Sequence, residues 1–215
     1  MINNPYLNIG TEASTGCIIL DRPKALNALS LDMCDALATA LRAWADDPAI
    51  DRVIISATPG RAFCAGGDVR AIAPDIRADI AAGDAYFLTE YQLDLLIHLF
   101  PKPVVVVANG LTMGGGAGVL LNASHPVITT AMDFAMPETA IGLFPDVGAS
   151  IFLRKAPPAV AAFLGMTGWR IGAGDMAHYG IAPRVIDADS HDALIRAVIN
   201  TPDTGGIDAV LDGFR

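Results

Sequence analysis

Residues 104–118 read VVVVANGLTMGGGAG, an apolar run rich in β-branched residues that is followed by a cluster of glycines. Such a run is typical of a strand whose two faces are both covered, as in parallel sheets that helices flank. The glycines from Gly114 onward lead out of this stretch into a predicted helix. A strand, a glycine turn and a helix together predict an α/β fold with right-handed crossovers, in which loops at the strand ends carry the site.

The same alternation of strand and helix continues on both sides of this stretch. A start rich in Gly, Ser and Thr precedes the first predicted strand, and loop signals at 59–60 and 65–68 frame Phe63. Residues 201–215 are predicted as a tail of one domain spanning 1–215. No internal repeat of 20 to 50 residues is evident. Strands are predicted at 17–20, 52–56, 126–130, 132–135 and 184–186, and helices at 31–47, 84–100, 147–155, 159–166, 175–178 and 191–199.

Composition narrows the class of protein. The chain has 215 residues, of which 53% are hydrophobic and 17% charged, so it can bury a sizeable core. The net charge of −9 argues against a nucleic-acid surface, and no apolar stretch approaches the roughly 20 residues of a membrane helix. The first five residues lack the pattern of a targeting leader, so we expect a cytoplasmic protein. The three cysteines are expected to be reduced, with Cys64 a small buried residue.

Two glycine-rich loops are the first candidates for chemistry, because a backbone N–H can approach a ligand oxygen closely where no side chain intervenes. If the amides of Gly67 and Gly115 converge, they form an oxyanion hole. The alternative is that these glycines serve only tight turns and close helix packing. Neither loop has the residues of a nucleotide-phosphate motif.

The segment MPETAIGLFPDVG, residues 136–148, supplies the second candidate site. It places Glu138 and Asp146 among apolar residues, and desolvation there should raise the pKa of both carboxyl groups toward neutrality, as general acid–base catalysis requires. The alternatives are a helix cap for Asp146 and an ordinary first-turn residue for Glu138. No serine lies in a nucleophile elbow and the four histidines form no ligand pair, so no metal site is expected.

Several motifs in order resemble the crotonase superfamily of enoyl-CoA hydratases and isomerases, and most of all its 3-hydroxyisobutyryl-CoA hydrolases. The resemblance covers about residues 17–199. It rests on DRPKALNAL at 21–29, AFCAGGD at 62–68, MGGG at 113–116 and the 136–148 segment. It implies a crotonase-like fold of repeated ββα units, shortened at the C-terminus, because these hydrolases continue well beyond Arg215.

The resemblance also implies roles for individual residues. Coenzyme A enters as part of the substrate, so no cofactor is needed, and the thioester carbonyl lies between the amides of Gly67 and Gly115. Glu138 attacks the thioester or activates water, while Asp146 assists and recognises a substrate hydroxyl. Further substrate-binding residues are predicted at Glu90, Gly66, Asp68 and Lys24, and Lys24, Arg22 and Arg70 are the candidates for the CoA phosphates.

One position separates the activities within the superfamily. Hydratases carry a second catalytic glutamate three residues after the glycine of the second amide, and Gly118 occupies that place here. Hydrolysis of 3-hydroxyisobutyryl-CoA in valine degradation is therefore the favoured function. The alternatives are a hydratase or isomerase of the same fold and a non-catalytic CoA-binding module. The acyl-CoA is the expected partner, within a homo-oligomer that is a trimer or a hexamer.

Overall fold

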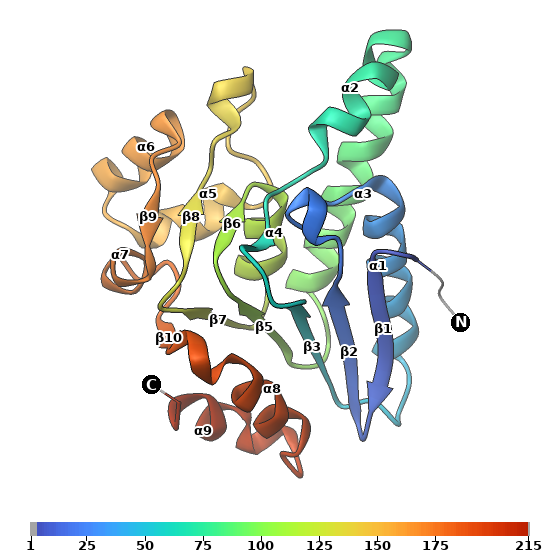
Figure 1. Cartoon of the computed structure of the whole chain (residues 1–215), viewed down its shortest axis with the longest axis vertical. Coiled ribbons are helices and arrows are strands. Elements are labelled where there is room, and N and C mark those ends of the chain that lie inside the picture. Colours follow the sequence, from blue (N-terminus) through green and yellow to red (C-terminus); the bar gives the residue numbers. More distant parts are fainter. Residues whose placement is uncertain (1–3, 215) are drawn as a thin grey trace.

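The structure, a computed structural model, describes residues 4–214, so the first three residues and Arg215 of the predicted domain lie outside it, as does part of the segment used to judge a targeting leader. Two sheets form its centre (Figure 1). The larger has the order β1 (Leu7–Glu12), β2 (Thr15–Leu20), β3 (Arg52–Ala57), β5 (Val104–Ala108), β7 (His125–Thr129) and β10 (Arg184–Ile186). The smaller has the order β4 (Ala62–Cys64), β6 (Leu111–Met113), β8 (Asp133–Ala135) and β9 (Ile171–Gly172).

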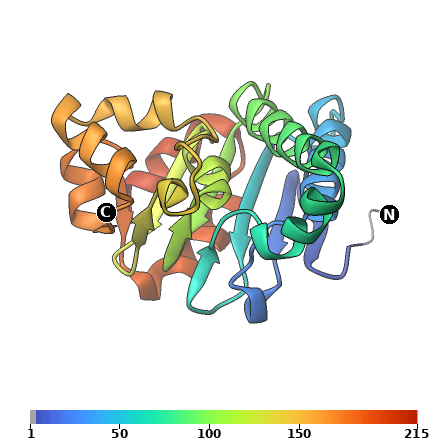
Figure 2. The ribbon, with the colours of Figure 1, turned by 90° about the horizontal axis from the view of Figure 1, so that it is seen from above.

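Helices surround the two sheets. Short 3-10 helices connect several of them, of which η1 (Pro23–Ala25) and η2 (Glu138–Ile141) matter for the site. The α-helices are α1 (Leu31–Ala45), α2 (Val69–Ala78), α3 (Ile80–His98), α4 (Gly115–Leu121), α5 (Ala149–Phe152), α6 (Pro158–Thr167), α7 (Ala173–His178), α8 (His191–Ile199) and α9 (Ile207–Asp212). Seen from above, α1 and α3 lie on the opposite side of the strands from α6 and α7 (Figure 2).

Successive strands divide between the two sheets in a regular way. β3, β5 and β7 enter the larger sheet, and the strand that follows each of them, β4, β6 or β8, enters the smaller one. Within each sheet these strands are parallel neighbours, and helices follow each pair along the chain. The repeated ββα units expected from the resemblance are therefore present, and they bring the carboxyl ends of β4 and β6 together.

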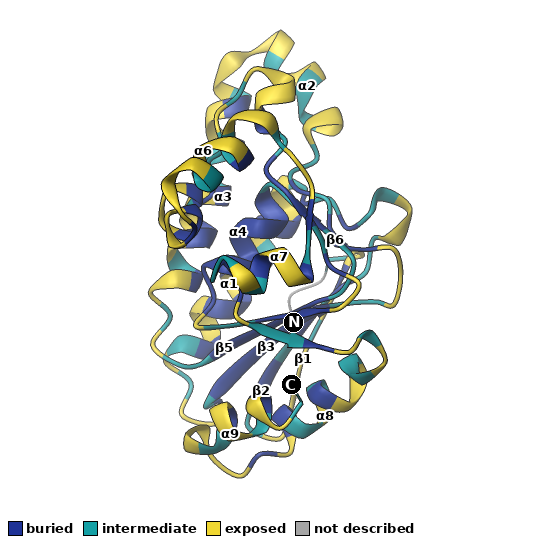
Figure 3. Cartoon of the chain, turned by 90° about the vertical axis from the view of Figure 1, so that its left-hand side faces the viewer, coloured by how far each residue is buried: buried dark blue, intermediate teal, exposed yellow. Residues whose placement is uncertain are grey.

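Both faces of β5 are covered, as its run of β-branched residues predicts. Val104 and Val106 face the main core, together with Leu37 of α1 and Leu93 of α3. Val105 and its neighbours on the other face belong to a second cluster with α8 and α9, which lie below the larger sheet in Figure 1. Burial on alternate faces explains why the central strands are dark blue in Figure 3, while α2, which has no buried residue, is mostly yellow.

Three elements of the fold were not predicted from the sequence. Residues 7–12 form β1, which pairs antiparallel with β2 but buries only Leu7, so its hydrophobic pattern is weak. The stretch 59–68 contains the three-residue strand β4. The predicted tail contains α9, which buries Ile207 and Leu211 against the second face of the larger sheet.

Helix α3 starts earlier than predicted and carries much of the site. The side chain of Asp79 caps it by accepting a hydrogen bond from the Ala81 amide at 3.0 Å, which satisfies an otherwise unpaired donor. Residues 86, 90, 93, 94 and 97 are buried, at the three- and four-residue steps of one helix face. Among the described residues, no helix is both long and apolar enough to cross a membrane.

Candidate active site

Two glycine loops lie side by side at the ends of the parallel strands β4 and β6. β4 leads to Gly66 and Gly67, and β6 leads through Gly114 to Gly115 at the start of α4. A Cβ atom placed on Gly115 would lie 3.4 Å from the Gly67 nitrogen, and one placed on Gly66 would lie 3.6 Å from the Gly115 nitrogen. The backbone amides of Gly67 and Gly115 therefore lie close together, as the predicted oxyanion hole requires.

Both amides are free to bind an oxygen atom. As the first residue of α4, Gly115 has no acceptor for its N–H within the helix. Across residues 4–214, the Gly67 amide donates none of the loop or capping hydrogen bonds of the backbone. Two neighbouring donors of this kind suit the negative oxygen that forms when a carbonyl carbon is attacked.

Neighbouring side chains explain why both positions are glycine. A Cβ atom on Gly67 would collide with the hydroxyl of Tyr86, and one on Gly115 would collide with Oε1 of Glu90. Tyr86 and Glu90 both come from α3, so this helix presses directly against the two loops. Any larger residue at either position has to displace the loop or the side chain.

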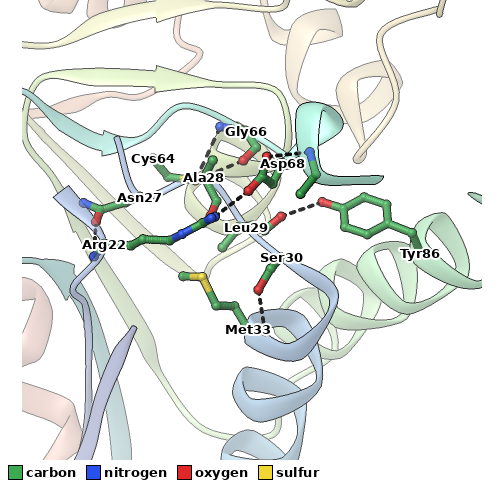
Figure 4. A network of polar contacts seen from close by, with 11 residues as sticks. Arg22, Asn27, Ala28, Leu29, Ser30, Met33, Cys64, Gly66, Asp68 and Tyr86 are labelled. Atoms are coloured by element: carbon green, nitrogen blue, oxygen red, sulfur yellow. Dashed lines mark hydrogen bonds and ion pairs between the residues drawn. The ribbon is translucent and has the colours of Figure 1, made fainter. Parts of the chain in front are cut away.

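A network of polar contacts holds the first loop in place (Figure 4). The Leu29 amide donates to the Gly66 carbonyl at 2.8 Å, and the Asp68 amide donates to the Leu29 carbonyl at 2.8 Å. The Tyr86 hydroxyl also donates to the Leu29 carbonyl, at 3.0 Å. Arg22 Nη1 donates to Asp68 Oδ2 at 2.6 Å. Four interactions thus fix the backbone on either side of the Gly67 amide.

Glu138 lies at the second loop, at the start of the 3-10 helix η2. Its side chain is buried, and its Oε1 lies 3.0 Å from the position of a Cβ atom on Gly114. Its Oε2 has no hydrogen-bond partner among the described residues. Burial, and then the charge of Asp146, raise the pKa of Glu138 to about 7, so the pKa elevation expected from the sequence is present. A carboxyl group with this pKa can both accept and give up a proton at neutral pH.

Asp146 faces α3 across the site. Its Oδ2 accepts a hydrogen bond from the Tyr91 hydroxyl at 2.6 Å. Burial raises the pKa of Asp146, and the Tyr91 hydrogen bond partly opposes that rise. The side chain does not cap α5, which begins three residues later after Gly148 and has no side-chain cap. Of the two alternatives open from the sequence, helix capping is therefore excluded.

The backbone after Asp146 is strained. Val147 has a φ angle of 45°, a region that a β-branched residue rarely adopts and that costs roughly 1–3 kcal/mol. The Asn122 side-chain amide donates to the Val147 carbonyl at 3.1 Å, and the Val147 side chain is buried in the main core. These contacts hold Asp146 in a fixed orientation.

Glu90 lies on the buried face of α3, and its predicted contact with substrate stays a prediction. It is only 3% exposed, so it is not a solvated helix residue, and its Oε1 lies 3.3 Å from the Tyr86 hydroxyl, whose one hydrogen is shared between Glu90 and the Leu29 carbonyl. Burial raises the pKa of Glu90 to about 7, with the charges of Asp146 and Glu138 acting in the same direction. Three carboxyl groups thus lie close enough to shift one another's pKa.

Asp94 is a fourth carboxyl group, and the sequence reading missed it. It lies one helical turn after Glu90 on α3, is 6% exposed, and neither carboxyl oxygen has a hydrogen-bond partner among the described residues. A Cβ atom on Gly118 would lie 2.7 and 2.9 Å from these two oxygens. Asp94 therefore fills the space that a side chain at position 118 would need. The four-residue spacing from Glu90, which places both on one helix face, was the available signal.

A cavity of about 440 Å³ opens between α3 and the loop that carries Asp146. Tyr91, Asp94 and Asp146 contribute polar groups to its wall. Most of the remaining wall is apolar, with Leu95, Phe144, Val147 and Ile151 among its residues. The cavity has the size and mixed lining of a small-molecule site.

The predicted basic residues are less closely tied to the site. Lys24 and Arg70 are exposed, in η1 and α2 respectively. Arg22 is already paired with Asp68, and its guanidinium also lies 4.9 Å from the ring centroid of Tyr6. Asp68 accepts a second hydrogen bond, from the Ala71 amide at 3.1 Å, so the structure gives it a part in shaping the loop. Substrate contacts of Lys24, Gly66 and Asp68 stay predictions.

Cys64 lies buried beside these loops, and burial raises the pKa of its thiol to about 12. A thiol with so high a pKa is a poor nucleophile, in agreement with the expectation of a small buried residue. Within residues 4–214, no group of three or more His, Cys, Asp or Glu side chains is arranged to hold a metal ion.

Comparison with known proteins identifies the family. The sequence model of the enoyl-CoA hydratase/isomerase family matches residues 15–215. The chain belongs to this family. It is 39% identical to the mitochondrial 3-hydroxyisobutyryl-CoA hydrolase of Danio rerio over 202 residues, which are 93% of this chain and 53% of that protein. It is also 39% identical to the mitochondrial enzyme of that name from Homo sapiens over 203 residues, 94% of this chain and 53% of that one.

Solved structures of the family confirm the crotonase-like α/β fold. A carnitinyl-CoA dehydratase from Mycobacterium thermoresistibile superposes with a TM-score of 0.91 at 35% identity, over 98% of this chain and 61% of that chain. An enoyl-CoA hydratase from Rhodobacter sphaeroides has a TM-score of 0.87 at 37% identity, over 97% of this chain and 65% of that chain. The chain spans about half the length of the curated relatives it matches. The cytoplasmic location expected from the sequence stays a prediction.

Proposed function

We propose that the chain hydrolyses acyl-CoA thioesters, with 3-hydroxyisobutyryl-CoA as its substrate. One observation carries the proposal: Glu138, with a pKa raised to about 7, lies beside the neighbouring amides of Gly67 and Gly115. The likeness to the 3-hydroxyisobutyryl-CoA hydrolases supports the choice of substrate.

The steps of the reaction follow from this arrangement. An oxygen nucleophile adds to the thioester carbon, and the two amides bind the negative oxygen that results. The carbon–sulfur bond then breaks, and the CoA thiolate that leaves takes up a proton. Glu138 is either the nucleophile itself, forming a mixed anhydride that water hydrolyses, or the base that removes a proton from the attacking water.

Hydration of an enoyl-CoA is the second candidate, and one observation favours it. Gly118 leaves the chain without the second glutamate of the hydratases, but the Asp94 carboxyl group lies in the space next to that position. The named activities of the two structural relatives, a hydratase and a dehydratase, point the same way. A second carboxyl group near the reacting water would serve hydration.

A thiol-release assay on a small panel of CoA thioesters tests both candidates. We expect free CoA thiol from 3-hydroxyisobutyryl-CoA, and a decrease of roughly 100-fold or more in Glu138→Gln, since loss of a general base or nucleophile costs at least that much. Glu12→Gln is the matched control, because Glu12 is exposed on β1.

Other outcomes of the same assay contradict hydrolysis. Hydration of crotonyl-CoA without thiol release would establish the second candidate. Binding of CoA thioesters with neither reaction would indicate the CoA-binding module. A thiol-release rate that is the same in Glu138→Gln as in the unsubstituted chain would remove Glu138 from the mechanism.

A single turnover in ¹⁸O-labelled water tests for the anhydride of Glu138. Label in the Glu138 carboxyl group after one turnover supports the anhydride. Label found only in the released acid excludes attack of water on the Glu138 carbonyl of an anhydride.

A further inference from the structure

Asp94 is a buried carboxyl group whose two oxygen atoms make no hydrogen bond within the described chain. It is 6% exposed and contributes to the wall of the 440 Å³ cavity. A buried polar group without a partner costs free energy. In native proteins such a group calls for an explanation, and a ligand that supplies the missing hydrogen bonds is one.

The surroundings of Asp94 restrict what this ligand can be. The nearest charged groups that influence it are the carboxyl groups of Glu90 and Asp146, and the charge of Asp94 in turn affects Cys34, Cys64 and Tyr91. All of these are acidic groups, and His98, four residues after Asp94 on α3, also lines the cavity. Burial and the two carboxyl groups raise the pKa of Asp94, which favours the protonated form. A protonated carboxyl group can donate one hydrogen bond and accept another.

The wall of the same cavity offers a complementary group. Asp146 lines this cavity together with Asp94, and its Oδ2 accepts a hydrogen bond from Tyr91. Between an acceptor and a donor, the group that satisfies both is a hydroxyl, which donates to Asp146 and accepts from Asp94. The carboxyl group of Asp94 lies against Gly118, where Val147 also limits the space, so the ligand group has to be small.

We propose that Asp94 is a specificity-determining residue that binds, together with Asp146, a hydroxyl group on the acyl chain of the substrate. This rests on the proposed function, because it assumes an acyl-CoA whose thioester lies at the two amides. A plain alkyl chain leaves the Asp94 carboxyl group without a hydrogen-bond partner, which disfavours that chain far more than a missing methyl group would.

The test compares a hydroxylated substrate with its deoxy analogue. We expect the chain to prefer 3-hydroxyisobutyryl-CoA to isobutyryl-CoA in kcat/KM, and Asp94→Leu to reduce that preference by about tenfold, the effect of about one hydrogen bond. Asp94→Asn keeps a donor at the same place and should keep the preference within about threefold. Asp84→Leu, at an exposed position on the same helix, is the matched control.

Equilibrium binding separates this proposal from the hydrolysis itself. The affinities of the two thioesters are measured by calorimetry for Glu138→Gln, with and without Asp94→Leu, so the ratio is obtained whether or not the chain turns over substrate. If no thioester is hydrolysed by the unsubstituted chain, the proposed function fails while the ratio still tests Asp94. A ratio unchanged by Asp94→Leu would overturn the role of Asp94. Tighter binding of an acyl chain bearing a quaternary ammonium than of the hydroxyacyl chain would overturn it as well.

Discussion

Replacing Glu90 by glutamine should stabilise the protein, and by an amount that depends on pH. Glu90 has its pKa raised from its ordinary value of 4.5 to about 7, first by burial and then by the charge of Asp146. The folded state therefore binds a proton at Glu90 more tightly than the unfolded state does. The contribution of this group to stability is complete below pH 4.5 and is lost as the pH rises to about 7.

The magnitude follows from the difference in pKa. Each tenfold difference in proton affinity corresponds to about 1.4 kcal/mol, so the rise from 4.5 to about 7 is worth about 3 kcal/mol at pH 8. Glutamine has nearly the same shape, can accept the hydrogen bond from Tyr86, and carries no charge. Glu90→Gln should change the free energy of unfolding by close to zero at pH 4 and raise it by about 3 kcal/mol at pH 8.

Urea unfolding between about pH 4 and pH 8 measures this difference, with Glu12→Gln as an exposed control that should stay flat. Asp146→Asn removes the second cause of the high pKa, so the effect of Glu90→Gln should shrink in that background. A Glu90→Gln chain that is destabilised equally at both ends of the pH range would refute the reasoning, because the carboxyl group would then act through packing or a hydrogen bond.

Three further outcomes follow from the site. If Glu138 acts as an ionised carboxylate, kcat/KM should fall about tenfold for each pH unit below about 7 and level off above it; a flat profile from pH 5 to 8 excludes that role. Tyr91→Phe removes the hydrogen bond that lowers the pKa of Asp146, so the Asp146 carboxyl group, followed by NMR, should titrate at higher pH than in the unsubstituted chain; an unchanged titration would mean that the hydrogen bond does not act on Asp146. Gly67→Ala should lower the free energy of unfolding by about 1–3 kcal/mol through its collision with the Tyr86 hydroxyl, and Tyr86→Phe in the same chain should restore part of that loss in urea unfolding; no recovery would mean that the backbone causes the loss.

The elements with strong local patterns could be predicted from the sequence. The valine run of β5 needs apolar cover on both sides, and the glycines after β4 and β6 leave room for neighbouring amides. The short strands β4 and β6 could not be recognised, because three residues carry no period. β1 was missed because it buries only Leu7. α9 was missed because it has only two buried residues, and these pack against the second face of the larger sheet, which the local sequence does not reveal.

The site residues that belong to a sequence motif could be predicted, whereas those brought to the site by helix packing could not. Glu138 and Asp146 stand in one mostly apolar segment, residues 136–148, in which two carboxyl groups are easy to recognise. Asp94 becomes visible only when α3 is placed against α4, because its relation to Gly118 joins positions that are 24 residues apart (118 − 94). The pKa values depend in the same way on burial, which composition alone does not reveal.

The left-handed backbone at Val147 has a consequence for substrate binding. The Asn122 hydrogen bond and the burial of the Val147 side chain stabilise this conformation, and both are present in the chain without substrate. Asp146 is therefore preorganised, with its direction decided during folding. Substrate should find this side of the pocket already shaped and bind without waiting for a loop to rearrange.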